Sequence, residues 1–262
     1  MSLFTSGDVA TFRSDRLMTL AATYAPSINP SEDYLLRQIR AAEREIARQL
    51  KVALEPTRVF PREPTEAEIA ALPEGMPWVE EPANDFDPSF FRGERWGFII
   101  LNKRPVLKVH SIRFVYPSPH QAFYTIPYDW IRLDKRAGHI RLVPASAAWS
   151  APLNAFLMAA MGGGMTIPGM IQVDYDAGLK DAVQEWPDLI EVILKKAALN
   201  VLENLYLPAS ASISGDGLSQ SISMDASKYR DLINETLFGP KGSNSGLFTA
   251  IHGLQLSVLG LV

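Results

Sequence analysis

The hydrophobic period of the chain changes from helical to strand-like and back again, and this change constrains the fold most. Between residues 35 and 53, apolar side chains recur every three or four positions, which is typical of an amphipathic helix. Between residues 96 and 178, short runs of β-branched and aromatic residues alternate with turn-forming residues. From Pro187 to Tyr206 the pattern is helical again. The sequence therefore predicts an α+β fold, with a helical bundle core and an inserted small antiparallel β-domain.

Signals at the ends of these elements set the expected domain boundaries. Asn29 is the expected N-cap of the first long helix, which ends before Pro56, and a third helix is expected over residues 225–237. The Ser/Gly-rich stretch 209–224 is expected to be a loop. We expect an N-terminal arm with the first long helix, a Pro-rich acidic excursion, a β-rich insertion domain, a helical core and a hydrophobic C-terminal extension. Their ranges are 1–52, 53–95, 96–178, 179–237 and 238–262.

The Pro-rich excursion differs from its neighbours in composition. It holds seven prolines, and its ten acidic residues outnumber its four arginines. Proline fixes the backbone and removes a hydrogen-bond donor, so this segment is expected to lie outside the core, with room for one helix at residues 65–72.

Composition and motifs argue against catalysis. The 262 residues are 47% hydrophobic and 21% charged, which excludes wholesale disorder, and they include no cysteine, which excludes disulfides and thiol nucleophiles. The glycines at 162–164 are not followed by the lysine and hydroxyl of a phosphate-binding loop. The acidic cluster within residues 80–87 lacks the spacing of a calcium-binding loop. The histidines are not spaced as metal ligands; they are His110, His120, His139 and His252. We predict no enzyme activity, no metal and no cofactor.

The net charge of −4 hides a strong local asymmetry. Residues 96–143 carry a charge of +6, whereas residues 53–95 carry −6. The basic segment is expected to meet an acidic partner surface, a neighbouring subunit's acidic arm or a passing DNA backbone. The expected assembly or DNA-facing patch consists of Lys103, Arg104, Arg132, Lys135, Arg136 and Arg141.

The last 17 residues contain no aspartate, glutamate, lysine or arginine. An apolar terminus either folds back onto its own core or docks onto another subunit, since exposure would favour aggregation. The candidate docking residues are Leu247, Phe248, Ile251, Leu254, Leu256 and Leu259.

Four stretches, taken in order, resemble the phage head–tail connector (adaptor) proteins, which form a ring beneath the portal of a tailed virus. The helix at residues 31–46 resembles the first helix of that family, and Arg104-Pro105-Val106 resembles the start of its strand signature. Residues 128–142 resemble the hairpin that follows, and residues 172–189 resemble a strand that leads into the next long helix. The excursion, the uncharged segment 144–168 and the C-terminal 55 residues exceed a minimal connector.

The resemblance implies a structural virion protein at the neck, assembled in the host cytoplasm. It implies a homo-oligomeric ring, commonly twelvefold, that joins the portal to the tail or collar protein. Genomic DNA would pass through the channel without sequence-specific binding, and no membrane would be involved. The C-terminal segment would then reach the portal.

Other interpretations stay open at this stage. The chain is also compatible with another virion part, such as a tail-completion, collar or baseplate protein, or with a ligand-binding enzyme whose site has no recognisable motif. A membrane role for residues 151–171 is disfavoured because prolines and glycines interrupt them.

Overall fold

The structure of the protein is a computed structural model, and its fold is α+β. It divides into two compact units: a helical unit between residues 2 and 51 and between 181 and 254, and a β-rich unit that occupies residues 52–180. The described residues are 3–24, 27–91, 97–115, 122–143, 166–205, 210–215, 218–223, 226–240 and 245–253.

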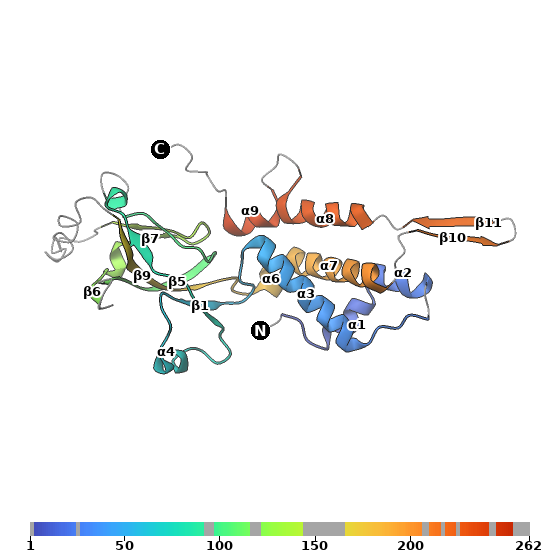
Figure 1. The fold of residues 1–262 in the computed structure, drawn as a ribbon, viewed down its shortest axis with the longest axis horizontal. Helices are drawn as coiled ribbons and strands as arrows, with labels where there is room; N and C mark the ends of the chain where they lie inside the picture. Colours follow the sequence, from blue (N-terminus) through green and yellow to red (C-terminus); the bar gives the residue numbers. More distant parts are fainter. Residues whose placement is uncertain are drawn as a thin grey trace. The chain divides into compact units, whose positions relative to one another are not determined.

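Two long helices, α3 (Glu32–Leu50) and α7 (Pro187–Leu205), form the centre of the helical unit and lie side by side (Figure 1). The apolar stripe of α3 is buried along its length, as the helical period predicted. An ion pair of 3.0 Å between Lys196 Nζ and Glu45 Oε1 joins the two helices. The predicted N-cap is wrong: Ser31, rather than Asn29, caps α3, because its hydroxyl accepts a hydrogen bond from the amide of Tyr34.

The N-terminal arm is helical and packed. It contains α1 (Asp8–Arg13) and α2 (Arg16–Tyr24), and the side chains of Val9 and Phe12 are buried. The amide of Leu3 donates a 3.0 Å hydrogen bond to Glu43 Oε1 on α3, which fixes the start of the described chain.

The C-terminal part of the helical unit contains α6 (Ala182–Glu185), α8 (Ala226–Phe238) and α9 (Leu247–His252). The buried imidazole of His252 donates from Nε2 to the carbonyl oxygen of Leu50 at 2.6 Å. This bond satisfies one of the carbonyls that the C-terminus of α3 leaves without an intrahelical partner.

The expectation of a loop at residues 209–224 is wrong. Strands β10 (Ser210–Gly215) and β11 (Leu218–Ser223) pair there as an antiparallel hairpin. The serines that suggested a loop alternate along these strands with other small or apolar residues, and this period of two is compatible with a strand.

The β-rich unit contains two sheets. The larger has the order β2-β1-β9-β5-β6, with β3 also paired to β9, and the smaller has the order β4-β8-β7. All pairs are antiparallel except β1 with β2, so the predicted antiparallel sheet is correct apart from this parallel pair. The strands are β1 (Thr57–Phe60), β2 (Trp78–Glu80), β3 (Asn84–Phe86), β4 (Ile99–Ile100), β5 (Val106–Val115), β6 (Ala122–Thr125), β7 (Ile131–Asp134), β8 (His139–Leu142) and β9 (Ile167–Ala177). Short 3-10 helices occupy Pro88–Phe91 and Tyr128–Trp130.

The prediction that residues 53–95 lie outside the core is wrong. This segment supplies β1, β2 and β3, and the side chains of Val59, Phe60 and Phe86 are buried. The prolines lie between these strands, where no ladder hydrogen bond is lost. The helix predicted at residues 65–72 is confirmed as α4 (Glu66–Ala70), and Thr65 and Glu68 form a reciprocal capping box at its start.

One hydrophobic cluster joins the two sheets. Ile112 on β5 and Tyr175 on β9 contribute from the larger sheet, and Ile140 on β8 contributes from the smaller one. The core of the β-rich unit therefore lies between the sheets.

Among the described residues, no helix is both long enough and apolar enough to cross a membrane. Most of the uncharged segment 144–168 lies outside the described residues, including the glycines at 162–164. Residues 167–171, at the end of the stretch considered for a membrane role, belong to β9.

Candidate interaction surface

The hairpin of β7 and β8 carries four of the six predicted patch residues. Its register pairs Arg132 with Arg141 and Asp134 with His139. Asp134 also organises the turn, because its Oδ1 accepts hydrogen bonds of 3.1 Å from the backbone amides of Arg136 and Ala137. The turn therefore has a defined conformation that holds Lys135 and Arg136 at the tip, where both side chains are exposed.

The loop before β5 brings the other two patch residues to the same place. The amide of Val106 donates to the carbonyl of Lys135 at 2.7 Å, and the amide of Leu101 donates to the carbonyl of Gly138 at 2.9 Å. Arg104 Nη1 donates to the carbonyl of Ala137 at 3.2 Å. The structure thus gathers all six residues on one hairpin and its adjoining loop. We call this set the cationic hairpin: Lys103, Arg104, Arg132, Lys135, Arg136 and Arg141.

None of the six cations forms an ion pair with a carboxylate in the described part of the chain. Arg132 Nη1 instead donates to the backbone carbonyl of Asp129 at 2.5 Å. Elsewhere Arg58, Arg62 and Lys196 do pair with carboxylates. Like charges directly opposite on neighbouring strands destabilise a sheet, so Arg132 and Arg141 impose a local cost that an anionic partner would relieve.

Apolar side chains lie on the same outer face as these cations. The guanidinium of Arg141 lies 5.9 Å from the ring centroid of Phe98, and that ring lies 5.0 Å from the imidazole of His139. Ile100, which pairs with His139 across β4 and β8, is 47% exposed. Burial lowers the pKa of His139, and Arg104 and Arg141 lower it further against the opposing effect of Asp134. His139 is therefore mostly neutral at pH 7.

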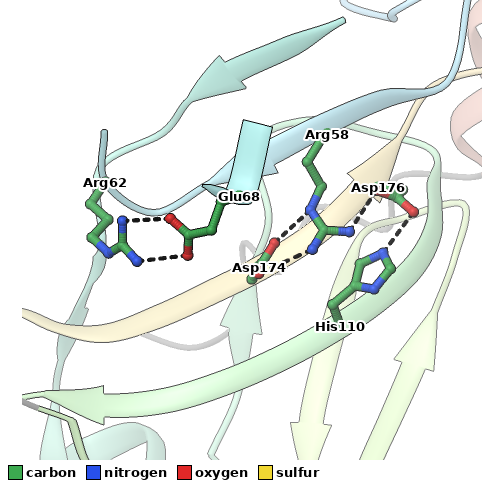
Figure 2. Close-up of polar contacts among 6 residues, drawn as sticks. All are labelled: Arg58, Arg62, Glu68, His110, Asp174 and Asp176. Atoms are coloured by element: carbon green, nitrogen blue, oxygen red, sulfur yellow. Dashed lines mark hydrogen bonds and ion pairs between the residues drawn. The ribbon is translucent and has the colours of Figure 1, made fainter. Parts of the chain in front are cut away.

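Figure 2 shows a second polar cluster, which the sequence did not predict. Arg58 on β1 lies between two carboxylates of β9: its Nε is 2.9 Å from Asp174 Oδ1, and its Nη1 is 3.2 Å from Asp176 Oδ1. His110 Nε2 on β5 lies 2.7 Å from the other oxygen of Asp176. The sequence signal was the spacing of the two aspartates, because residues two apart on a strand share a face.

The groups of this second cluster contact mainly one another. Both carboxylates contact Arg58, and burial raises the pKa of Asp174 although Arg58 opposes the rise. No serine, threonine or lysine side chain has a hydrogen bond to His110 among the described residues, and these residues contain no group that could hold a metal ion. The geometry fits cross-strand stabilisation of the sheet by charge-assisted hydrogen bonds.

The acidic cluster within residues 80–87 is divided among separate structural roles. Glu81 is buried and accepts a 2.7 Å hydrogen bond from the hydroxyl of Tyr175. Its other oxygen accepts from the side-chain amide of Asn102 at 2.8 Å. Burial, together with the neighbouring Glu81 carboxylate, raises the pKa of Tyr175. Asp85 Oδ1 accepts from the amide of Gly169 at 2.8 Å, so these acids fasten the Pro-rich segment to the sheet.

Acidification is expected to loosen α4 through Glu68. Arg62 donates two side-chain hydrogen bonds to Glu68, at 2.7 and 3.0 Å (Figure 2). Together with the backbone amide of Thr65, they lower the pKa of Glu68 from 4.5 to about 2. Because the folded pKa is the lower one, the contact stabilises fully above pH 4.5 and is lost as the pH falls towards 2. The contact is one-third exposed, so its contribution is below about 1 kcal/mol.

Proteolysis within residues 62–72 measures this effect. Above pH 4.5, we expect the native protein to be cleaved more slowly in this segment than the Glu68→Gln variant. This difference in cleavage rate is expected to shrink as the pH falls towards 2. A difference that stays constant over this range would contradict the assignment.

The predicted docking residues of the C-terminal segment fall partly on α9. Leu247 and Ile251 are buried within the helical unit, and Phe248 is half-buried, with its ring 6.0 Å from that of Phe238. The other three, Leu254, Leu256 and Leu259, lie outside the described residues. Docking by this segment stays a prediction, for which Leu247 and Ile251 would first have to leave their own core.

Comparisons with known proteins give distant structural likenesses, of which two are described here. No known family matches the sequence, and no curated protein matches it. Among solved structures, a chain from "Neck of empty GTA particle computed with C6 symmetry" is 17% identical with a TM-score of 0.42. A chain from "Virion of native gene transfer agent (GTA) particle" is 17% identical with a TM-score of 0.40. Each alignment covers 80% of this chain and 86% of the other. Likenesses at this level carry no argument about what this chain binds.

Proposed function

We propose that this chain is a structural virion protein: a head-to-tail connector whose copies form a ring between the portal and the tail or collar protein. One observation carries the proposal. The β-rich unit is inserted into the helical unit between α3 and α7, which is the architecture that the resemblance to connector proteins implies.

The elements that make up this architecture are those that carry the resemblance. The stretch at residues 31–46 lies in α3, and Arg104-Pro105-Val106 leads into β5. Residues 128–142 contain the β7–β8 hairpin, and residues 172–189 run from β9 into α7. The order of the motifs along the sequence is thus also the order in which the chain leaves the helical unit and returns to it.

A ring subunit must present surfaces to its neighbours as well as to its axial partners. The cationic hairpin supplies one such surface, because its charges have no carboxylate partners among the described residues. The C-terminal segment that follows α9 supplies a second, uncharged one. In the connector function, this segment reaches the portal and genomic DNA passes through the ring.

Negative-stain images and light scattering of the purified protein, alone and with its portal protein, test the proposal. We expect rings of uniform size that bind the portal, and we expect truncation after Gly253 to abolish portal binding while leaving the rings intact. This truncation retains α9 and its buried side chains, so it separates docking from folding. Monomers that bind no portal under any condition would overturn the proposed function, and unchanged portal binding by the truncated protein would overturn the role of the tail.

A further inference from the structure

The helical unit contains an acidic pocket. The pocket has a volume of about 400 Å³ and lies between the start of α7, the end of α8 and α9. Its lining includes three carboxylates, from Glu185, Asp188 and Glu235, and the apolar side chains of Trp186 and Leu247. Concave shape, negative charge and an aromatic wall together favour a cationic side chain as occupant.

The three carboxylates of this pocket have no cationic partner among the described residues. All three residues are exposed, and none has a side-chain hydrogen bond or ion pair with the described chain. Other acids of the same unit are paired, since Glu45 and Glu203 contact Lys196 and Arg230. The pocket therefore mirrors the cationic hairpin: each surface holds several charges of one sign that have no oppositely charged partner among the residues that the structure describes.

We propose that the cationic hairpin of one copy of this chain binds the acidic pocket of a second copy, with Lys135 and Arg136 at the tip entering the pocket. The inference rests on the proposed function, because it names the contact between neighbouring subunits of the ring. The two surfaces are different, so the contact is head-to-tail, and a head-to-tail contact generates a ring when its rotation closes.

The surroundings of the hairpin favour protein over DNA as its partner. Ile100 is 47% exposed beside the cations, and Phe98 stacks with Arg141 on the same face. Arginine and aromatic residues are enriched where protein interfaces derive most of their binding energy. A phosphodiester backbone needs the cations alone, whereas the pocket offers both carboxylates and an apolar wall.

Charge reversal on each surface provides the test. The hairpin variant is Lys135→Glu with Arg136→Glu, and the pocket variant is Glu185→Lys with Glu235→Lys. Asp188 is left unchanged because it lies in the first turn of α7, where a negative charge stabilises the helix. Each variant alone would place like charges at the contact, so we expect assembly at least about tenfold weaker in low salt, with a smaller loss in high salt.

Mixing the two variants is the decisive step. The reversed hairpin of one is complementary to the reversed pocket of the other, so an equimolar mixture is expected to form rings in which the two alternate. A single chain that carries all four substitutions is expected to assemble on its own. Light scattering measures the ring mass, and native mass spectrometry measures the ratio of the two variants.

Matched controls separate this contact from a general effect of charge. The control for the hairpin variant is Arg40→Glu with Arg44→Glu, which changes the net charge by the same amount at exposed positions of α3. The control for the pocket variant is Glu74→Lys with Glu80→Lys, at exposed positions of the β-rich unit. Both controls should assemble like the native protein, and circular dichroism should show that all variants fold.

The outcomes distinguish the inference from the function on which it rests. A native protein that forms no rings overturns the proposed function. Native rings that survive both reversals overturn only this inference, as do folded variants whose mixture stays unassembled. If the mixture fails and the hairpin variant also loses retention of a short DNA duplex, the hairpin binds DNA instead and the inference is overturned.

Discussion

Replacing Gly178 by alanine is expected to destabilise the β-rich unit by about 3 kcal/mol or more. Gly178 follows β9 with a φ of +118°, which side-chain-bearing residues rarely adopt. A Cβ atom at this position would lie 2.3 Å from the carbonyl oxygen of Glu55 and 3.0 Å from that of Ala53. Both neighbours are backbone atoms, and the amide of Leu179 is hydrogen-bonded to the same Ala53 carbonyl, so the segment cannot move aside without losing that bond.

Gly169→Ala is the matched control for this prediction. Gly169 lies on β9 with a positive φ of +63°, but apart from its neighbours in sequence no atom of the described residues lies within 4 Å of the site of its Cβ. The strain of the left-handed backbone is then the only cost of the alanine side chain, so we expect the free energy of unfolding to fall by about 1 kcal/mol. Urea unfolding monitored by tryptophan fluorescence measures both variants. Equal losses would show that the close approach to Glu55 does not determine the need for glycine.

Replacing Glu81 by alanine is expected to lower the free energy of unfolding by roughly 3 kcal/mol, because it leaves the buried hydroxyl of Tyr175 without its acceptor and removes two further hydrogen bonds from Asn102. Glu81 accepts from the hydroxyl of Tyr175 at 2.7 Å and from both the backbone and side-chain amides of Asn102, at 3.3 and 2.8 Å. Its side chain thereby links the Pro-rich segment to the loop before β5 and to β9. That loop also carries Lys103, whose amide donates to the Tyr175 hydroxyl at 3.2 Å.

Two measurements separate this network from simple loss of volume. Glu81→Gln keeps the shape of the side chain and one acceptor oxygen, so we expect it to lower the free energy of unfolding by only about 1 kcal/mol. Hydrogen exchange at the amides of Asn102 and Lys103 should accelerate in Glu81→Ala before the rest of the sheet is affected. Unchanged protection there would mean that Glu81 does not hold the loop in place.

Local patterns predicted the elements whose stability is local. The three- and four-residue period identified α3 and α7, and the stretch between prolines left room for α4. These signals depend on residues that lie close together in the sequence. The N-cap of α3 was misplaced by two residues, since Asn29 and Ser31 are both good caps and only the hydrogen bond to Tyr34 distinguishes them.

Elements held by distant partners could not be predicted in this way. Strands β1, β2 and β3 have three or four residues each, too few to show a period between prolines. Arg58 pairs with Asp176, which is 118 positions away, and Glu81 bonds to Tyr175 across 94 positions. A segment rich in proline and acids looked external because its partners are encoded far from it.

The sequence by itself determined where the positive charges are and that an α+β chain carries them. It could not show that these charges lack carboxylate partners in the described part of the chain, because residues 53–95, just before them, carry a net charge of −6, equal and opposite to that of residues 96–143. Only the tertiary structure decided this. Hydrogen bonds from the loop at residues 101–106 to the β7–β8 turn gather the six cations, whereas Glu81 and Asp85 accept hydrogen bonds from β9 of the larger sheet. Charge is a property of composition, but neutralisation depends on distances that the fold sets.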